Sequence, residues 1–203
     1  MNFMRGMAGF TAAACIACTA RASIVSYNSN PGIEGLGSYS GSTEWTYLGG
    51  NAGVVEITLT NTSDPANGGF LTGFAFNVAP QVKMAYDEGR AGWDGVFEVS
   101  ASPLGDFDHG AALGGNWLGG GSPVLGIGVG QTFVFRYDVR GEESLLATII
   151  AHDFFDETEG WGFAARFRGF ADGGSDKVTA SLPSPGALAL LALGSLGARR
   201  RRR

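Results

Sequence analysis

The sequence predicts an all-β domain, either an antiparallel β-sandwich or a jelly roll. Several short segments alternate apolar with polar or small residues, which is the period of a half-buried strand. Glycine-rich breaks separate these segments and are typical of turns. A sheet with one apolar face must bury that face against another layer, so we expect two packed sheets.

Four segments carry the alternation, and each is expected to form a strand. They are residues 55–60 (VEITLT), 74–78 (FAFNV), 133–139 (FVFRYDV) and 161–168 (WGFAARFR). In the third segment, alternate residues should share one face of the strand. Phe133, Phe135, Tyr137 and Val139 are therefore expected to point into the core.

The segments between these strands are less regular. Residues 142–151 begin with helical composition, but Thr148, Ile149 and Ile150 favour strand, so any helix should be short. The alternating glycines of residues 126–130 predict a turn between strands, because no Lys-Ser/Thr pair follows as in a phosphate-binding loop. Residues 61–63 match a glycosylation acceptor and are more simply the end of a strand.

Residues 1–22 have the order of a secretory signal peptide. A positive charge at Arg5 precedes an apolar stretch, and Ala20 and Ala22 lie three and one positions before a cut ahead of Ser23. The two cysteines, Cys15 and Cys18, both lie in this segment. The mature domain would then contain no disulfide, and lipid attachment at one of these cysteines is an alternative.

Residues 182–203 have the order of a sorting and anchoring signal. Pro183, Ser184, Pro185 and Gly186 form an extended segment, because proline fixes the backbone. The apolar run at residues 186–198 would give about 20 Å of helix, short of the roughly 30 Å hydrocarbon core. Arg199, Arg200, Arg201, Arg202 and Arg203 would hold the end in the cytoplasm. We expect a transient membrane stop; a buried amphipathic helix is the alternative.

This tail resembles the sorting signal of PEP-CTERM proteins, which are exosortase substrates of Gram-negative bacteria. Ser184 stands where the family motif has glutamate, and the Pro-Ser-Pro variant with a polyarginine end is similar to tails of planctomycete-type bacteria. The resemblance implies an exosortase-type processing enzyme as a partner. It also implies a transient inner-membrane anchor and a final place on the cell envelope surface or outside the cell.

Two further resemblances are weaker. Residues 59–63, 71–76, 163–170 and 173–177 are similar to segments of exported β-sandwich proteins bearing this tail, a group with no established activity to carry over. Residues 182–186 also resemble the sortase motif Leu-Pro-x-Thr-Gly of Gram-positive bacteria. Pro185 replaces the threonine there, which removes the hydroxyl and changes the backbone that a sortase recognises.

The body of the chain, residues 23–181, is long enough for one domain with a sizeable core. All 19 acidic residues lie in it, whereas seven of the 14 basic residues lie in the two removable ends. Seven basic against 19 acidic residues leaves a net charge of about −12. Such a surface disfavours nucleic acid as a partner.

Carboxylates are concentrated in one segment near the end of the body. Asp153, Asp156, Glu157 and Glu159 could supply oxygen ligands to Ca²⁺, although their spacing is not that of an EF-hand. The alternative is a solvated acidic loop. Residues 106–109 and 172–176 are shorter clusters, expected to be turns whose Asp side chains bond the local backbone.

Catalytic motifs are weak. His109 and His152 are the only histidines, and the sequence has no Gly-x-Ser-x-Gly elbow, so we expect no enzyme. A two-carboxylate glycosidase stays an alternative, because its acids need only the right separation in space.

The aromatic residues are mostly expected in the core, with Trp93 and Trp117 exposed because they lie beside Gly and Asn. The sequence therefore predicts an exported surface or extracellular-matrix protein with a non-enzymatic structural role. The alternative is a carbohydrate-binding or Ca²⁺-dependent adhesion module, with extracellular polysaccharide as its partner.

Overall fold

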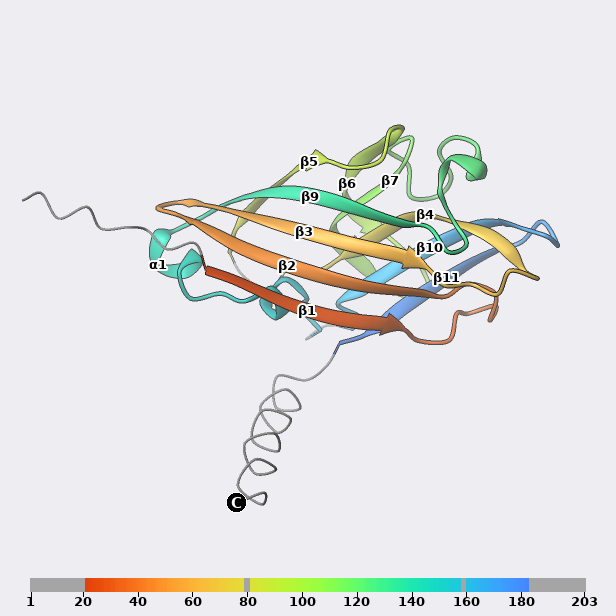
Figure 1. The fold of residues 1–203 in the computed structure, drawn as a ribbon, viewed down its shortest axis with the longest axis horizontal. Coiled ribbons are helices and arrows are strands. Elements are labelled where there is room, and N and C mark those ends of the chain that lie inside the picture. The colour runs from red at the N-terminus through yellow and green to blue at the C-terminus, as the bar shows by residue number, and fades with distance from the viewer. Residues whose placement is uncertain (1–20, 79–80, 158–159, 183–203) are drawn as a thin grey trace, which may run out of the picture.

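A computed structural model describes residues 21–78, 81–157 and 160–182. These residues form an all-β fold in which eleven strands belong to one antiparallel sheet (Figure 1). The order across the sheet is β5-β9-β3-β2-β1-β11-β10-β4-β7-β6, and β8 pairs with β4 off this path. The strands are β1 (Arg21–Ser29), β2 (Tyr39–Gly49), β3 (Ala52–Asn61), β4 (Gly68–Phe76), β5 (Lys83–Glu88), β6 (Trp93–Ser100), β7 (Asp106–Leu113), β8 (Ile127–Gly128), β9 (Thr132–Arg140), β10 (Phe163–Phe170) and β11 (Ser175–Ser181).

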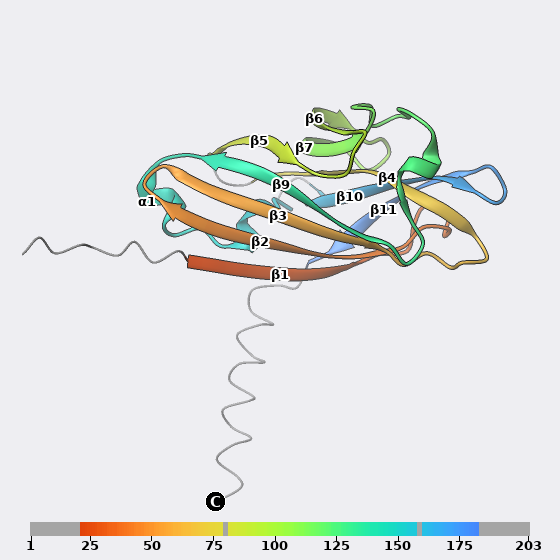
Figure 2. The same cartoon turned by 45° about the horizontal axis from the view of Figure 1, so that its top comes forward.

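The sheet is nearly closed. Its two halves are joined by β1 and β11, the first and last described strands along the chain (Figures 1 and 2). β1 pairs with β2 from Arg21 to Asn28, but meets β11 only at Asn28 and Ser29. Beyond that junction the 3-10 helix η2 (Ala151–Phe154) lies against β1, and the Ala151 N–H donates to Ser23 Oγ at 2.8 Å. The two halves therefore face each other like the layers of a sandwich while remaining connected at one side.

Aromatic residues from both halves meet in the core. Phe74 of β4 packs against Phe135 of β9, with ring centroids 4.8 Å apart. Tyr27 of β1 packs against Phe163 of β10 at 5.2 Å. Burying rings of this size from facing strands is the main source of stability that such a fold has available.

The strand predictions are confirmed in their centres and shifted at their ends. Residues 55–60 lie in β3 and residues 133–139 in β9, where Phe135, Tyr137 and Val139 are fully buried and Phe133 is partly buried. Strand β4 ends at Phe76, before Asn77, and β10 begins at Phe163, after Trp161. Both ends fall where the chain leaves the sheet to form the pocket described below.

The short-element predictions have mixed outcomes. Helix α1 covers only Glu143–Leu146, because the β-branched residues that follow leave the helix before η2. The glycines at residues 126–130 form β8 and a turn, in which Gln131 N–H donates to Gly128 O, as expected. Residues 61–63 do end a strand: Asn61 is fully buried and its amide donates to Gly69 O and Ile127 O.

The two shorter acidic clusters differ from expectation. Asp106 and Asp108 are not in a turn but open β7, so that prediction was wrong. Asp172 does form the expected local turn, accepting from the Gly174 N–H at 2.7 Å. Asp176 lies in β11 and is buried, so it is not a turn residue. Pairing with β6 and β10 outweighs the local turn preference of these aspartates.

A second, smaller core lies on the outer face of β4, β7 and β10, under the loop of residues 114–126. Trp117 from this loop packs with Ala75, Ala112 and Ala164, and is 6% exposed. Trp93 is also buried, and packs against Phe135 at 4.9 Å. The expectation that Trp93 and Trp117 are exposed was therefore wrong. Trp93 packs into the main core from β6, and the glycines around Trp117 let its loop fold back over the sheet.

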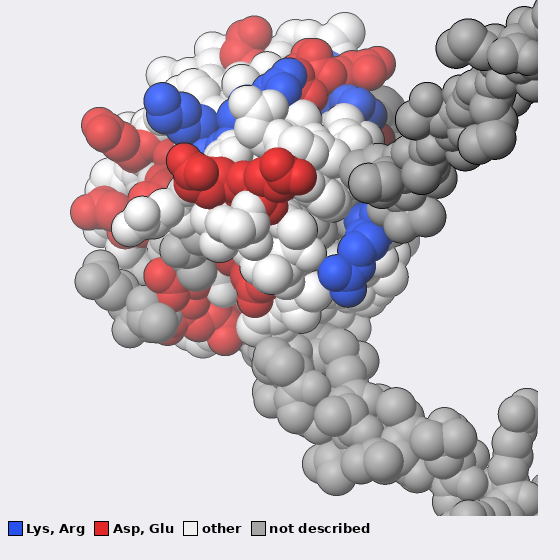
Figure 3. All heavy atoms as spheres, turned by 90° about the vertical axis from the view of Figure 1, so that its left-hand side faces the viewer, with Lys and Arg blue, Asp and Glu red and all other residues white. Residues whose placement is uncertain are grey.

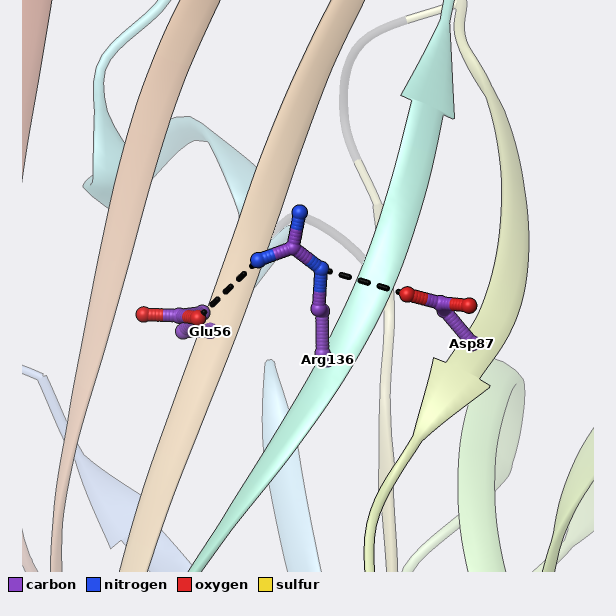
Figure 4. Close-up of polar contacts among 3 residues, drawn as sticks. All are labelled: Glu56, Asp87 and Arg136. Carbon is purple, nitrogen blue, oxygen red and sulfur yellow. Dashed lines mark hydrogen bonds and ion pairs between the residues drawn. The ribbon is translucent and has the colours of Figure 1, made fainter.

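The outer face of the other half carries an ion-pair network across three strands (Figure 4). Arg136 of β9 lies between Glu56 of β3 and Asp87 of β5, at 3.3 and 3.2 Å. All three side chains are partly exposed, so their contribution to stability is small.

The predicted processing sites mostly lie outside the described residues. These are Ala20, the motif Pro183, Ser184, Pro185 and Gly186, and the arginines at 199–203. Ala22 and Ser23, which flank the expected signal cleavage point, are described and belong to β1.

Candidate functional site

A cavity of about 790 Å³ opens where β4 and β6 end and β7 begins. Four separate stretches of the chain form its wall, so no short motif encodes it. Its lining residues are Asn77, Glu98, Ser100, Leu104, Gly105, Asp106, Phe107, Asp108, Asp156 and Trp161.

Asn77 organises this wall through its backbone and side chain. Its backbone N–H donates to Gly162 O at 3.1 Å, and its backbone carbonyl accepts from Asp156 N–H at 3.0 Å. Its side-chain oxygen accepts from Asp108 N–H at 3.1 Å, and its amide donates to Trp161 O at 3.3 Å. One asparagine thus holds the segment before β10 against the start of β7.

The pocket combines negative charge with one exposed aromatic ring. Trp161 is 44% exposed, whereas Trp45, Trp93 and Trp117 are between 2% and 6% exposed. None of the lining residues is basic, and four are acidic: Glu98, Asp106, Asp108 and Asp156. Figure 3 looks at the left-hand side of Figure 1, where several groups of acidic side chains lie over the surface, with some basic side chains between them. The indole offers a flat apolar face and the carboxylates accept hydrogen bonds from hydroxyl or ammonium groups.

The backbone at Glu98 is unusual. Its φ of 50° makes it the one described non-glycine residue with a positive φ. A side chain in this region is strained, and such strain is often found at functional sites. The neighbouring pairs Phe97–His109 and Val99–Phe107 keep β6 in register with β7 on either side.

The sequence-predicted metal ligands are not brought together as a set. Asp153 accepts from the Ile150 N–H at 2.9 Å and caps η2, while Asp156 lines the pocket. Glu157 is exposed, and Glu159 lies outside the described residues. Within residues 21–78, 81–157 and 160–182, no group of three or more His, Cys, Asp and Glu residues is placed to hold a metal ion.

Of the two histidines, His109 lies among aromatic rings. His109 of β7 contacts the Phe97 ring at 5.5 Å and the Phe76 ring at 6.1 Å. Burial lowers the pKa of His109, and the nearby charge of Asp108 partly offsets this effect. Among the described residues, the buried Nδ1 atom of His109 has no hydrogen-bond partner.

Sequence reasoning missed this pocket, although it singled out several of its residues separately. Trp161 lies between Gly160 and Gly162, and the buried Trp93 directly follows Gly92. Glycine neighbours therefore do not distinguish an exposed tryptophan from a buried one. The role of Asn77 depends on contacts with residues more than 30 positions away.

Comparison of the chain with protein-family models, with curated protein sequences and with solved structures gives no match. Among the described residues, no helix has the length and apolar character needed to cross a membrane. Function is therefore inferred from the residues of this chain alone.

Proposed function

We propose that this chain is an exported cell-surface or extracellular-matrix protein with a non-enzymatic structural role. The observation that carries the proposal is the order of its segments: a signal-like N-terminus, a folded β domain and a sorting-like tail. The buried residues of the main core come from positions between Val25 and Ala180, and Leu182 packs against them. Removal of residues 1–22 and of the segment after Leu182 would therefore spare this core.

In this proposal, residues 1–22 are a signal peptide removed between Ala22 and Ser23. The apolar run at residues 186–198 forms a short helix that stops in the inner membrane, with Arg199–Arg203 on the cytoplasmic side. An exosortase-type enzyme then processes the tail at Pro183–Gly186. The domain, a β-sandwich or jelly roll without cysteine, is left on the envelope surface or in the extracellular polymer.

The test is mass spectrometry of the chain expressed in a host that carries an exosortase. We expect an extracellular form that begins at Ser23 and lacks the arginine cluster. Replacing Arg199–Arg203 by glutamates should leave unprocessed precursor, because the membrane stop is lost. Lys83→Glu, an exposed change on β5, is the control and should be processed normally. An extracellular form with an intact C-terminus at Arg203 would contradict the proposal.

The pocket favours a second candidate function, that of a carbohydrate-binding module on the same exported domain. The specific observation is the exposed Trp161 beside four carboxylates on a wall fixed by Asn77. Apolar faces of sugar rings stack on indole, and their hydroxyls donate to carboxylates. An extracellular polysaccharide fits both features.

Binding of the mature protein to the host's extracellular polysaccharide tests this candidate. Trp161→Ala should abolish binding, whereas Leu118→Ala should retain it, since Leu118 is 66% exposed and does not line this pocket. Repeating the assay with millimolar Ca²⁺ and with a chelator tests the Ca²⁺-dependent form of the idea. Equal binding by the two variants would contradict a role for the pocket.

A further inference from the structure

Three basic side chains lie together on the outer face of β10 and β11. Arg166 stands directly opposite Lys177 across the two strands, and Arg168 follows two residues later on the same face as Arg166. All three side chains are intermediate in exposure. Residues directly opposite in an antiparallel pair have Cβ atoms about 5 Å apart, so the charges of Arg166 and Lys177 are close.

The hydrogen bonds of these side chains go to neutral oxygens. Arg166 Nη1 donates to Trp117 O at 3.1 Å, and Lys177 Nζ donates to Ser102 O. Arg168 Nη2 donates to Gly120 O at 2.8 Å. Carbonyl oxygens satisfy donors but do not neutralise a charge.

No carboxylate in the described ranges forms an ion pair with Arg166, Arg168 or Lys177. This is unexpected in a domain whose acidic residues far outnumber its basic ones. Arg136 on the other half of the sheet shows the usual arrangement, because carboxylates flank it on both sides.

The cluster is therefore electrostatically uncompensated. Burial lowers the pKa of Arg166, and the charge of Arg168 lowers it further. Burial and then the charge of Arg166 lower the pKa of Lys177. Arg166 Nε is also buried, with no hydrogen-bond acceptor among the described residues. Like charges held side by side are destabilising, so an anion bound here would stabilise the fold.

We propose that Arg166 and Lys177 form a binding site for an oxyanion group, with Arg168 adding to the positive potential. The bonds above do not use the second terminal nitrogen of Arg166 or the remaining hydrogens of Lys177, so these donors are available to a ligand. A planar guanidinium beside an ammonium suits a carboxylate, sulfate or phosphate group. The site differs from the acidic pocket in charge and in ligand, and does not depend on the route of export.

The two lysines of the chain provide a matched test. The full-length protein, purified in a mild detergent, is titrated with inorganic sulfate or phosphate by calorimetry at constant ionic strength. Lys177→Gln should weaken binding about tenfold, the loss expected for one charge-assisted hydrogen bond. Lys83→Gln, an exposed change on edge strand β5, should leave binding unchanged. Circular dichroism shows whether each variant is folded.

A second set of ligands identifies the source of the oxyanion. Oligosaccharides that carry uronate or sulfate groups are compared with the inorganic ions and with a neutral oligosaccharide. Tighter binding of the acidic oligosaccharides would assign the site to an acidic polysaccharide, and binding of inorganic ions alone would assign it to a free anion. The proposal is overturned if the wild-type protein binds none of them, or if Lys177→Gln and Lys83→Gln bind equally well.

Discussion

The carboxylate of Asp176 occupies the space that a side chain on Gly32 would need. A Cβ placed on Gly32 would lie 2.7 Å from Asp176 Cγ, well inside van der Waals contact. Asp176 is 2% exposed and accepts four backbone hydrogen bonds. The donors are the N–H groups of Glu34, Leu36, Gly37 and Lys177, at distances between 2.8 and 3.0 Å. A single buried side chain thus shapes the connection between β1 and β2.

We expect Asp176→Asn to lower the free energy of unfolding by about 1–3 kcal/mol, because an amide nitrogen cannot accept the bonds of the oxygen that it replaces. Gly32→Ala should cost a similar amount through overpacking. Urea denaturation measures both. Asp172→Asn is the control, since Asp172 accepts only an exposed local bond. A loss as large in the control would show that burial of Asp176 is not the cause.

The inward and outward faces of β9 can be compared at neighbouring positions. Phe135→Ala should cost about 3–5 kcal/mol, because a fully buried ring leaves a cavity. Arg136→Ala should cost under about 1 kcal/mol, because its two ion pairs are partly exposed. Thermal or urea unfolding of the two variants gives the comparison. Equal losses would contradict the register of β9 against the core.

Stability should fall steeply in alkali because of buried tyrosines. Burial raises the pKa of Tyr86 to about 12, and raises those of Tyr27, Tyr39 and Tyr137 as well. The stabilisation is complete below about pH 10, which is the pKa of tyrosine in the unfolded chain. It is lost as the pH rises through the tyrosine pKa values of the folded protein. Urea midpoints from about pH 9 to about pH 12 measure the loss. Tyrosinate absorbance near pH 10, with the fold intact by circular dichroism, would refute this expectation.

Arg168 should control the loop of residues 114–126, since it bonds the carbonyls of Gly120 and Gly121. We expect Arg168→Met to speed amide hydrogen exchange in this loop and to shift Trp117 fluorescence towards that of a solvated indole. Arg136→Met, which removes an arginine from the other half of the sheet, should do neither. Unchanged exchange in Arg168→Met would mean that other contacts, such as Trp117 packing and the Arg166 bond to Trp117 O, hold the loop.

The parts of the fold that could be predicted are those fixed by local alternation. Strand β9 was predicted almost to its ends because Phe135, Tyr137 and Val139 alternate with polar residues in one unbroken run. The prediction for Asp106 and Asp108 was wrong because aspartate favours turns. A short stretch of sequence does not show that β7 pairs with β4 and β6.

The candidate site could not be predicted either, because only the pairing of strands distant in sequence brings its residues together. Asp156 was singled out as part of an acidic segment, but the residues around it come from β6, β7 and the end of β4. Asp153, its neighbour in sequence, instead caps η2. Which carboxylates share a pocket is decided by strand order, which the sequence pattern does not specify.

The place of β11 has a consequence for when the domain can fold. β11 is the last of the described strands to be made, yet it lies between β10 and β1, the first of them. The two halves of the sheet cannot be joined until residues 175–181 have emerged from the machinery that makes or translocates the chain. Residues 182–203 follow β11 directly, so the sheet closes only as this segment begins to be made. If the chain crosses a membrane from its N-terminus, as proposed above, the two halves of its sheet would stay unjoined until residues 175–181 have crossed.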